Sequence, residues 1–285
     1  MNPDGTLDIL PAGGAWATPY SAAGALALSA PHITSRGVLL APFGSIDLQA
    51  GKSLTLAAGS VTSVSDDDGI AIPFGRSQGG LDWTYPLGNY RNIQNGTPQK
   101  TITLAAPDID LAAGAKVNLN GGGELSAFEF IAGPGGSRDV LDTNGAYAIV
   151  PAYRFEYAAY DPLEFAASGL TPGDSIYLSA DSGLPAGSYV LLPAHYALLD
   201  NAYLITPQAG TTDMAAGTTA VRSDGASIVA GYRYLAGTNV ADSRWSGFAV
   251  EPGAIARTRS EYQETTASRF FAAAGGAGLP SDAGN

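Results

Sequence analysis

Apolar side chains alternate with polar ones in short triplets that recur about every eight residues. The triplets form two blocks, and bends rich in glycine, alanine and proline separate them within each block. Alternate side chains of a strand lie on one face, so each triplet directs two apolar groups inward. Three such strands make one coil of a solenoid, and stacked coils pair as parallel ladders. The triplets are residues 38–40, 46–48 and 54–56, then 102–104, 109–111 and 117–119.

The two blocks also match each other in sequence. Residues 46–51 and 109–114 align residue for residue and differ only at the fourth position. We therefore predict an all-β fold built on a parallel β-helix, or solenoid. The alternative is an antiparallel sandwich or barrel, whose strands have a similar spacing. The bends between the triplets lack the paired Asn-Gly or Asp-Gly signals of antiparallel hairpins.

The periodicity breaks in two places. Residues 65–100 are expected to leave the solenoid as an extra-helical loop insertion. From Tyr147 onward, longer strand-like runs predict an inserted β-rich globular domain. The expected domains are 1–35 as a lead-in or edge segment, 36–145 as the coils, 146–270 as the β-rich domain and 271–285 as a linker. Runs predicted as strands in the β-rich domain are 175–178, 188–192, 202–205 and 227–234, and the best helix candidate is 256–274.

Composition excludes several function classes. The 285 residues include 37 Gly, 18 Pro and no Cys, and the net charge is −12. Without cysteine there is no thiol nucleophile, disulfide or Cys-ligated metal site, and an acidic chain without a basic domain is not expected to bind nucleic acid. No run approaches the roughly 18 apolar residues of a spanning helix, so no membrane-spanning segment is expected. Residues 1–30 contain no Lys or Arg and no signal-peptide pattern, so we expect an internal piece of a longer protein.

Candidate ligand-binding side chains lie in the 65–100 insertion. Trp83, Tyr85 and Tyr90 could stack on sugar rings or insert into a receptor, or they could form the small core of the insertion itself. Calcium is the one cofactor candidate, because closely spaced carboxylates supply the hard oxygen ligands that it prefers. A solvated acidic turn is the alternative, and the spacings of an EF-hand and of a calcium β-roll are absent. The carboxylates are those of Asp66, Asp67 and Asp68.

Few residues suit catalysis. His195 lies in an apolar run, where a hydrogen-bonded structural histidine is expected rather than a general base. Ser188 lacks the Gly-x-Ser-x-Gly context of a hydrolase nucleophile. Asp108 and Asp110 share the outward face of a predicted strand, where they could serve a glycosidase, although alternating strands also expose such residues for solubility alone. The blocks contain no cluster of basic residues of the kind that a polysaccharide lyase uses, so we expect no enzyme.

Several stretches resemble the C-terminal part of large filamentous-haemagglutinin-like exoproteins of the two-partner secretion family. They are the repeat blocks and residues 59–65, 69–75, 121–125 and 184–193. The resemblance covers about residues 35–280. It implies a right-handed parallel β-helix, an extra-helical domain and export through an outer-membrane two-partner secretion transporter. It implies no catalytic residue.

These observations predict a segment of a secreted or surface-displayed bacterial adhesin-like exoprotein. Its coils would be a structural shaft, and its β-rich domain would bind a host-surface glycan or protein receptor. Two alternatives stay open, a polysaccharide-degrading β-helix enzyme (a lyase or glycosidase) and a structural spacer only.

Overall fold

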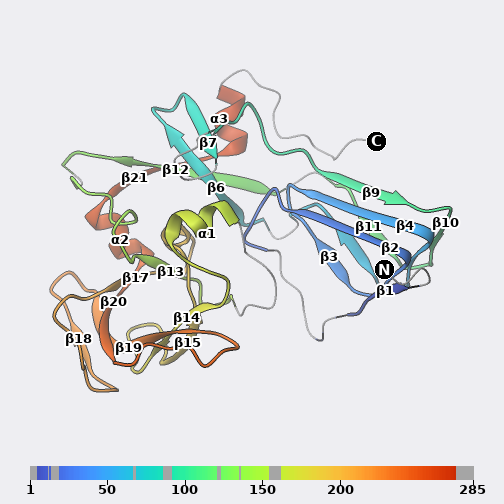
Figure 1. Cartoon of the computed structure of the whole chain (residues 1–285). Helices are drawn as coiled ribbons and strands as arrows, with labels where there is room; N and C mark the ends of the chain where they lie inside the picture. The colour runs from blue at the N-terminus through green and yellow to red at the C-terminus, as the bar shows by residue number, and fades with distance from the viewer. Residues whose placement is uncertain are drawn as a thin grey trace. The chain divides into compact units, whose positions relative to one another are not determined.

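The computed structural model describes residues 5–11, 13, 19–66, 69–85, 92–120, 123–134, 136–153 and 162–273, and most of its regular structure is β (Figure 1). The predicted all-β class is confirmed. The chain divides into two compact units. The first comprises residues 1–85, 93–127 and 265–285, and the second comprises residues 86–92 and 128–264.

Parallel strands form the larger sheet of the first unit. Strand β2 (Ala25–Ser35) pairs on one side with β1 (Thr6–Ile9) and on the other side with β4 (Ser45–Leu56). The far side of β4 pairs with β9 (Thr101–Ala105) and then with β10 (Asp108–Leu111). All these pairs are parallel, so the two repeat blocks lie side by side with the same strand direction.

Three short strands form a smaller parallel sheet in the first unit. Strand β5 (Val61–Ser63) lies between β3 (Val38–Leu40) and β11 (Lys116–Asn118). Both pairs are parallel and in register. The pairing between the two blocks is shifted from the sequence match, because residues 109–111 pair with 54–56 rather than with 46–48.

Apolar side chains occupy the same ladder position in successive strands. Leu7, Ile33, Leu54 and Ile109 form one column across the β1–β2–β4–β10 ladder. Ile33 and Leu54 are almost wholly buried. Because burial of a side chain of this size contributes about 1.5–3 kcal/mol, each column stabilises the stacking of the strands.

The stack differs from the sequence prediction at its start and in one bend. The prediction began the coils at residue 36, but the expected lead-in segment 1–35 supplies β1 and β2. The apolar alternation of Leu26, Leu28 and Ile33 packs β2 against the core of β4. The predicted bend at 49–52 is continuous strand, because β4 extends through it over 12 residues.

The 65–100 insertion contains a β-hairpin. Strands β6 (Ala71–Gln78) and β7 (Asp82–Tyr85) pair in antiparallel fashion. Gly79 and Gly80 form the turn with φ of 58° and 64°, a backbone region that glycine adopts without steric cost. On the other side of β6 lies β12 (Glu124–Ile131), within which the division between the two units falls.

The second unit is built on an eight-stranded sheet that is nearly closed into a barrel. Its strand pairs are antiparallel, and the four runs that the sequence predicts as strands lie in β14, β15 with β16, β17 and β19. The strands are β13 (Tyr147–Ile149), β14 (Asp174–Leu178), β15 (Gly187–Val190), β16 (Leu192–Pro193), β17 (Tyr203–Pro207), β18 (Thr219–Val221), β19 (Ser227–Leu235) and β20 (Ser246–Pro252). Helix α1 (Pro162–Ser168) and the short η1 (Ala194–Leu198) lie in the connections.

The end of the chain departs from the predicted single helix and linker. The described residues of the helix candidate, 256–273, fall into α2 (Gly253–Arg259), β21 (Glu261–Thr266) and α3 (Ala267–Ala273). The Thr-rich run of β21 favours a strand, since β-branched side chains lose more freedom in a helix. Residues 271–273 of the expected linker belong to α3, and the remainder of that linker lies outside the described residues.

Candidate functional site: an aromatic cluster on the second unit

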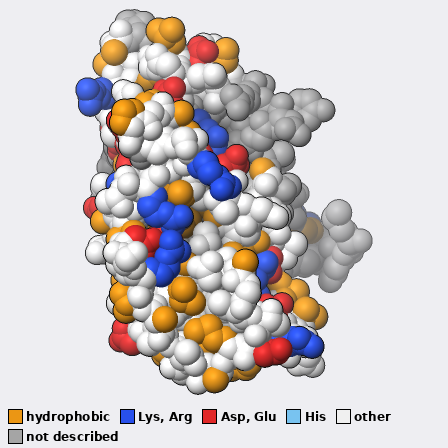
Figure 2. Space-filling view, turned by 90° about the vertical axis from the view of Figure 1, so that its left-hand side faces the viewer, with side chains coloured by type: hydrophobic (Ala, Val, Ile, Leu, Met, Phe, Trp, Pro, Cys, Tyr) orange, Lys and Arg blue, Asp and Glu red, His pale blue; other side chains and the backbone are white. Residues whose placement is uncertain are grey.

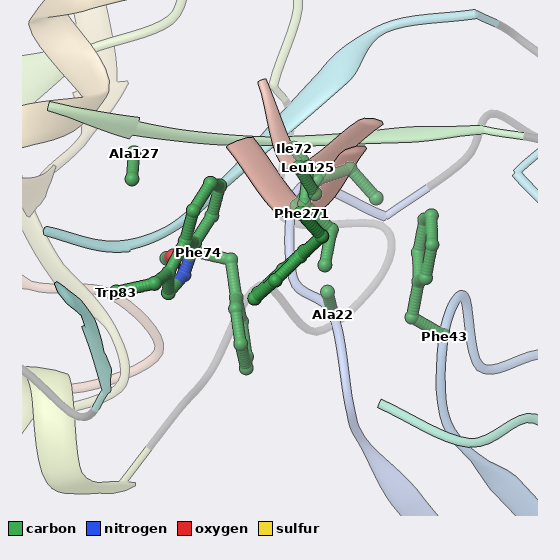
Figure 3. Close-up of a cluster of buried hydrophobic side chains, with 9 residues drawn as sticks. Ala22, Phe43, Ile72, Phe74, Trp83, Leu125, Ala127 and Phe271 are labelled. Atoms are coloured by element: carbon green, nitrogen blue, oxygen red, sulfur yellow. The ribbon is translucent and has the colours of Figure 1, made fainter. Parts of the chain in front are cut away.

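One binding candidate of the insertion, Trp83, lies in the core of the first unit (Figure 3), and a second, Tyr85, packs against that core. Trp83 has only 1% of its surface exposed, and its ring stacks on Phe271 with centroids 5.5 Å apart. Tyr85 is partly buried and stacks on Phe74 at 4.0 Å. The sequence offered a core of the insertion itself as the alternative to a sugar platform, whereas this core also contains residues from outside the insertion, among them Phe43, Leu125 and Phe271. Tyr90, the third candidate, lies outside the described residues.

The acidic triplet is described only at its first residue. Asp66 is 2% exposed, and its side chain lies against Gly123, where a Cβ would come 2.9 Å from its Oδ2. Asp66 is therefore a buried packing position rather than part of a solvated turn. Asp67 and Asp68 lie outside the described residues, and within the described ranges no group of three acidic or histidine side chains could hold a metal ion.

His195 occupies a packed interior position. Its Nε2 lies 3.6 Å from Oε1 of Glu164, and both side chains are 4% exposed. Its ring also stacks on Phe128, with centroids 6.0 Å apart. Ser188 is exposed on β15, and Asp108 and Asp110 are exposed on β10. The contacts of His195 with Glu164 and Phe128 therefore form no open cleft around its ring.

Four aromatic side chains gather on one face of the second unit's sheet. The rings of Tyr177 and Tyr232 stack with centroids 5.6 Å apart and planes 27° apart. Trp245 meets both of them edge-on, at 6.0 Å from Tyr177 and 5.0 Å from Tyr232. Tyr234 extends the group, with its ring 6.1 Å from that of Tyr232. We call these four residues the aromatic cluster.

The strand register brings the cluster together. Tyr177 of β14 lies directly opposite Tyr232 of β19 in the antiparallel ladder, so their side chains share one face. Ile176 and Leu178, which point to the other face of β14, are fully buried. The face with the tyrosines is therefore the outward one, and all four rings remain partly exposed. Gly231 allows β14 and β19 to approach closely here, because any Cβ at that position would collide with the carbonyl oxygen of Tyr177.

A charged loop borders the cluster. The backbone N–H of Asp213 donates to the carbonyl oxygen of Trp245 at 2.8 Å, and Asp213 itself has a φ of 64°. Its carboxylate pairs with Arg244 at 3.2 Å, with both side chains mostly exposed. Thr211 fixes the same loop by accepting a 2.9 Å hydrogen bond from the N–H of Gly247. The ion pair of Arg244 and Asp213 thus lies next to Trp245, since Arg244 precedes it in the chain and Asp213 bonds to its carbonyl oxygen.

This combination of groups suits a ligand with both apolar faces and hydroxyl groups. Aromatic faces carry a negative quadrupole and attract C–H groups and cations. The tyrosine hydroxyls, Arg244 and Asp213 offer hydrogen-bond donors and acceptors around them. A sugar ring presents an apolar face and a polar edge of this kind.

Two buried polar networks support the rest of the second unit. Glu251 is fully buried, forms an ion pair with Arg259, and lies 3.9 Å from Arg222. The Tyr262 hydroxyl donates to Asp139 at 2.7 Å. Burial raises the pKa of Tyr262 above its ordinary value of about 10, and the hydrogen bond to Asp139 raises it further.

One face of the molecule carries mixed charge. On the face shown in Figure 2, Lys and Arg side chains lie next to Asp and Glu side chains, and apolar side chains are scattered between them. Such a face does not provide the continuous basic field that binds a nucleic-acid backbone. No helix in the described part of the chain has both the length and the apolar character needed to cross a bilayer.

Comparison of the chain with protein-family models, with curated proteins and with solved structures gives no match. Its function is therefore argued from its own residues.

The aromatic cluster was not among the predicted sites, although the sequence contains a signal for it. Residues 175–178 and 227–234 were both predicted as strands, and Tyr232 and Tyr234 stand two positions apart within the second run. That spacing puts both tyrosines on one face. Strand pairing decides which face is outward, and it brings Tyr177 and Trp245 next to these two tyrosines. The sequence does not specify that pairing.

Proposed function

We propose that this protein is a segment of a secreted or surface-displayed bacterial adhesin-like exoprotein that binds glycans through the aromatic cluster. The observation that carries the proposal is the group of four partly exposed rings, Tyr177, Tyr232, Tyr234 and Trp245, on the outward face of a rigid antiparallel sheet. Aromatic side chains held on paired strands lose little further freedom on binding, which favours recognition.

The proposed ligand is a neutral glycan of a host or other cell surface. Stacking of a sugar ring on Tyr232 or Trp245 would bury apolar area, and Arg244 and the tyrosine hydroxyls would bond sugar hydroxyls. Acidic polysaccharides fit less well, because the chain carries a net charge of −12 and would repel them. A protein receptor is the other ligand class that partly exposed aromatic side chains can bind.

The first unit has the role of a shaft in this proposal. Its parallel ladders, with apolar columns running from strand to strand, are consistent with coils of a right-handed parallel β-helix. The resemblance to filamentous-haemagglutinin-like exoproteins supports the same architecture, with export through an outer-membrane transporter as its implied partner. In such a protein the shaft would carry the binding unit away from the cell.

A glycan array tests the proposal. The full chain is applied to an array that includes neutral and sialylated glycans, alongside Trp245→Ala and the matched control Val221→Ala, whose side chain is 75% exposed on β18 opposite Ser227. We expect binding to neutral glycans that Trp245→Ala loses and Val221→Ala keeps. Equal binding by both variants contradicts the proposed site, and no binding by any form favours the structural spacer. Release of unsaturated uronides or reducing ends from a polysaccharide panel would instead support the enzyme alternative.

A further inference from the structure

The last strand of the β1–β2–β4–β10 ladder leaves its apolar column exposed. Ile109 and Leu111 are 41% and 55% exposed, whereas Leu54 and Leu56, which occupy the same columns one strand earlier, are fully buried. In the described part of the chain, no strand pairs with the far side of β10. An exposed strand edge of this kind is a template for pairing with another strand.

The opposite end of the ladder has a matching strand. β1 is the terminal strand there, with sequence Thr-Leu-Asp-Ile against Asp-Ile-Asp-Leu in β10. Tracing the register through β2 and β4 puts Thr6 in the same column as Asp108, Leu7 with Ile109, Asp8 with Asp110, and Ile9 with Leu111. The two ends therefore present the same polar and apolar order in the same direction.

The backbone groups at the two ends are also complementary. The N–H of Ala112 donates to Leu56 at 2.9 Å, so by alternation the N–H and C=O groups of Ile109 and Leu111 point away from β4. At the other end, the N–H of Arg36 donates to the carbonyl oxygen of Ile9 at 2.8 Å. The N–H and C=O groups of Thr6 and Asp8 therefore point away from β2. With Leu7 of one copy opposite Ile109 of another, Ile109 meets the outward groups of Thr6 and Asp8.

We propose that β10 of one copy pairs in parallel and in register with β1 of a second copy. The pairing continues the column order already present in the ladder and covers Ile109 and Leu111 with Leu7 and Ile9. Because the two surfaces differ, the contact is head-to-tail and repeats without closing, which gives open linear assemblies. This interface is independent of the proposed glycan site.

Charged side chains affect the strength of the proposed association. Asp110 and Asp8 would lie in one column about 4.8 Å apart, and two carboxylates at that distance repel each other. Arg36 already binds Asp8 at 2.6 Å and offsets part of the repulsion. We therefore expect weak association at neutral pH and low salt, and stronger association when salt screens the carboxylates or when Asp110 is neutralised.

Disulfide mapping tests the register directly. The full-length variants Thr6→Cys and Asp108→Cys are mixed, because these positions share a column across the interface and their Cα atoms would lie about 4.8 Å apart. A disulfide spans Cα separations of about 4.4–6.8 Å. The natural chain has no cysteine, so every disulfide joins introduced positions of two copies. Circular dichroism of each variant checks that these exposed substitutions leave the fold intact.

The matched control pairs Thr6→Cys with Asp110→Cys, which are two residues out of register. Their Cα atoms would lie about 8 Å apart, beyond disulfide reach. After oxidation in a glutathione buffer, mass spectrometry is expected to find the 6–108 disulfide at least about fivefold above the 6–110 disulfide and above either homodimer. Equal yields, or no mixed disulfide, would overturn the proposal.

Sedimentation velocity gives a second, independent readout. Ile109→Lys places a charge in the exposed column and is expected to weaken association, whereas Asp110→Asn is expected to strengthen it. Val240→Lys makes the same kind of change at a position 65% exposed in the second unit and should leave association unchanged. Equal weakening by both lysine variants, or a monomer for the natural chain and Asp110→Asn alike, would also overturn the proposal.

Discussion

The indole N–H of Trp83 donates a 2.8 Å hydrogen bond to the carbonyl oxygen of Phe74, which lies on the neighbouring strand of the insertion's hairpin. Phe271, from the end of the described chain, stacks on the same indole. The insertion and α3 thus share one core in the first unit. Trp83 is a structural residue in this arrangement, and its loss is expected to reduce stability rather than ligand binding.

Trp83→Ala should lower the free energy of unfolding by about 3–5 kcal/mol, the range for removing a buried large aromatic side chain. Trp83→Phe should cost less, because it keeps most of the packing and loses the hydrogen bond to Phe74. Urea unfolding followed by circular dichroism measures both. A cost below about 1 kcal/mol for Trp83→Ala would contradict the buried position.

Two glycines of the first unit provide a matched test of close strand stacking. A Cβ on Gly44 would collide with the carbonyl oxygen of Gly24 and lie 2.9 Å from its nitrogen, whereas a Cβ on Gly51 would meet only the Cα of Pro31 at 3.7 Å. Gly44→Ala should therefore cost about 1–3 kcal/mol, as overpacking does. Gly51→Ala should change stability by less than about 0.5 kcal/mol. Thermal unfolding compares the two variants, and equal effects would contradict the described packing.

The buried Glu251 should make Arg259 costly to remove. Arg259→Met leaves a fully buried carboxylate without its main partner, so we expect a loss of about 3–5 kcal/mol. The control is Arg244→Met, which breaks the exposed pair with Asp213 and should cost no more than about 1 kcal/mol. Urea unfolding measures both losses. A small loss for Arg259→Met would mean that Arg222 or solvent compensates Glu251.

Tyr262 should make stability depend on alkaline pH. Its folded-state pKa is raised, so the neutral phenol is favoured in the folded protein. The resulting stabilisation is fully present below the unfolded pKa of about 10 and is lost as the pH rises above that value. Tyr262→Phe should lower stability at pH 7 through loss of the bond to Asp139 and should show a shallower decline above pH 10. Identical slopes for the two proteins would contradict this account.

The alternation of apolar and polar residues predicts the strands of the first unit well. The apolar residues that alternate along each strand are the same ones that form columns between stacked strands. The choice of ladder partners was not predicted: the repeat match aligns Ile46 with Ile109, whereas the ladder pairs Ile46 with Ile102 and Leu54 with Ile109. The inclusion of β2 and the approach of Phe271 to Trp83 were not predictable in this way. Both depend on contacts between segments that are far apart in the sequence, and a short sequence repeat carries no information about such contacts.

The candidate site illustrates the same limit. From the sequence, Trp83 and Tyr85 could be either exposed binding residues or core residues of their insertion, because burial depends on what packs against a loop. The tyrosines of β14 and β19 looked like ordinary strand residues. They become a shared surface through the pairing of Tyr177 with Tyr232 and the addition of Trp245.

The central claim is that glycans bind at the aromatic cluster of the second unit. Isothermal titration calorimetry with the neutral glycan selected from the array tests it most directly, using the natural chain, Tyr232→Ala and Trp83→Phe. The account predicts a Kd at least tenfold higher for Tyr232→Ala, about 1.4 kcal/mol of binding free energy, and an unchanged Kd for Trp83→Phe. An unchanged Kd for Tyr232→Ala, with circular dichroism confirming its fold, would contradict the account.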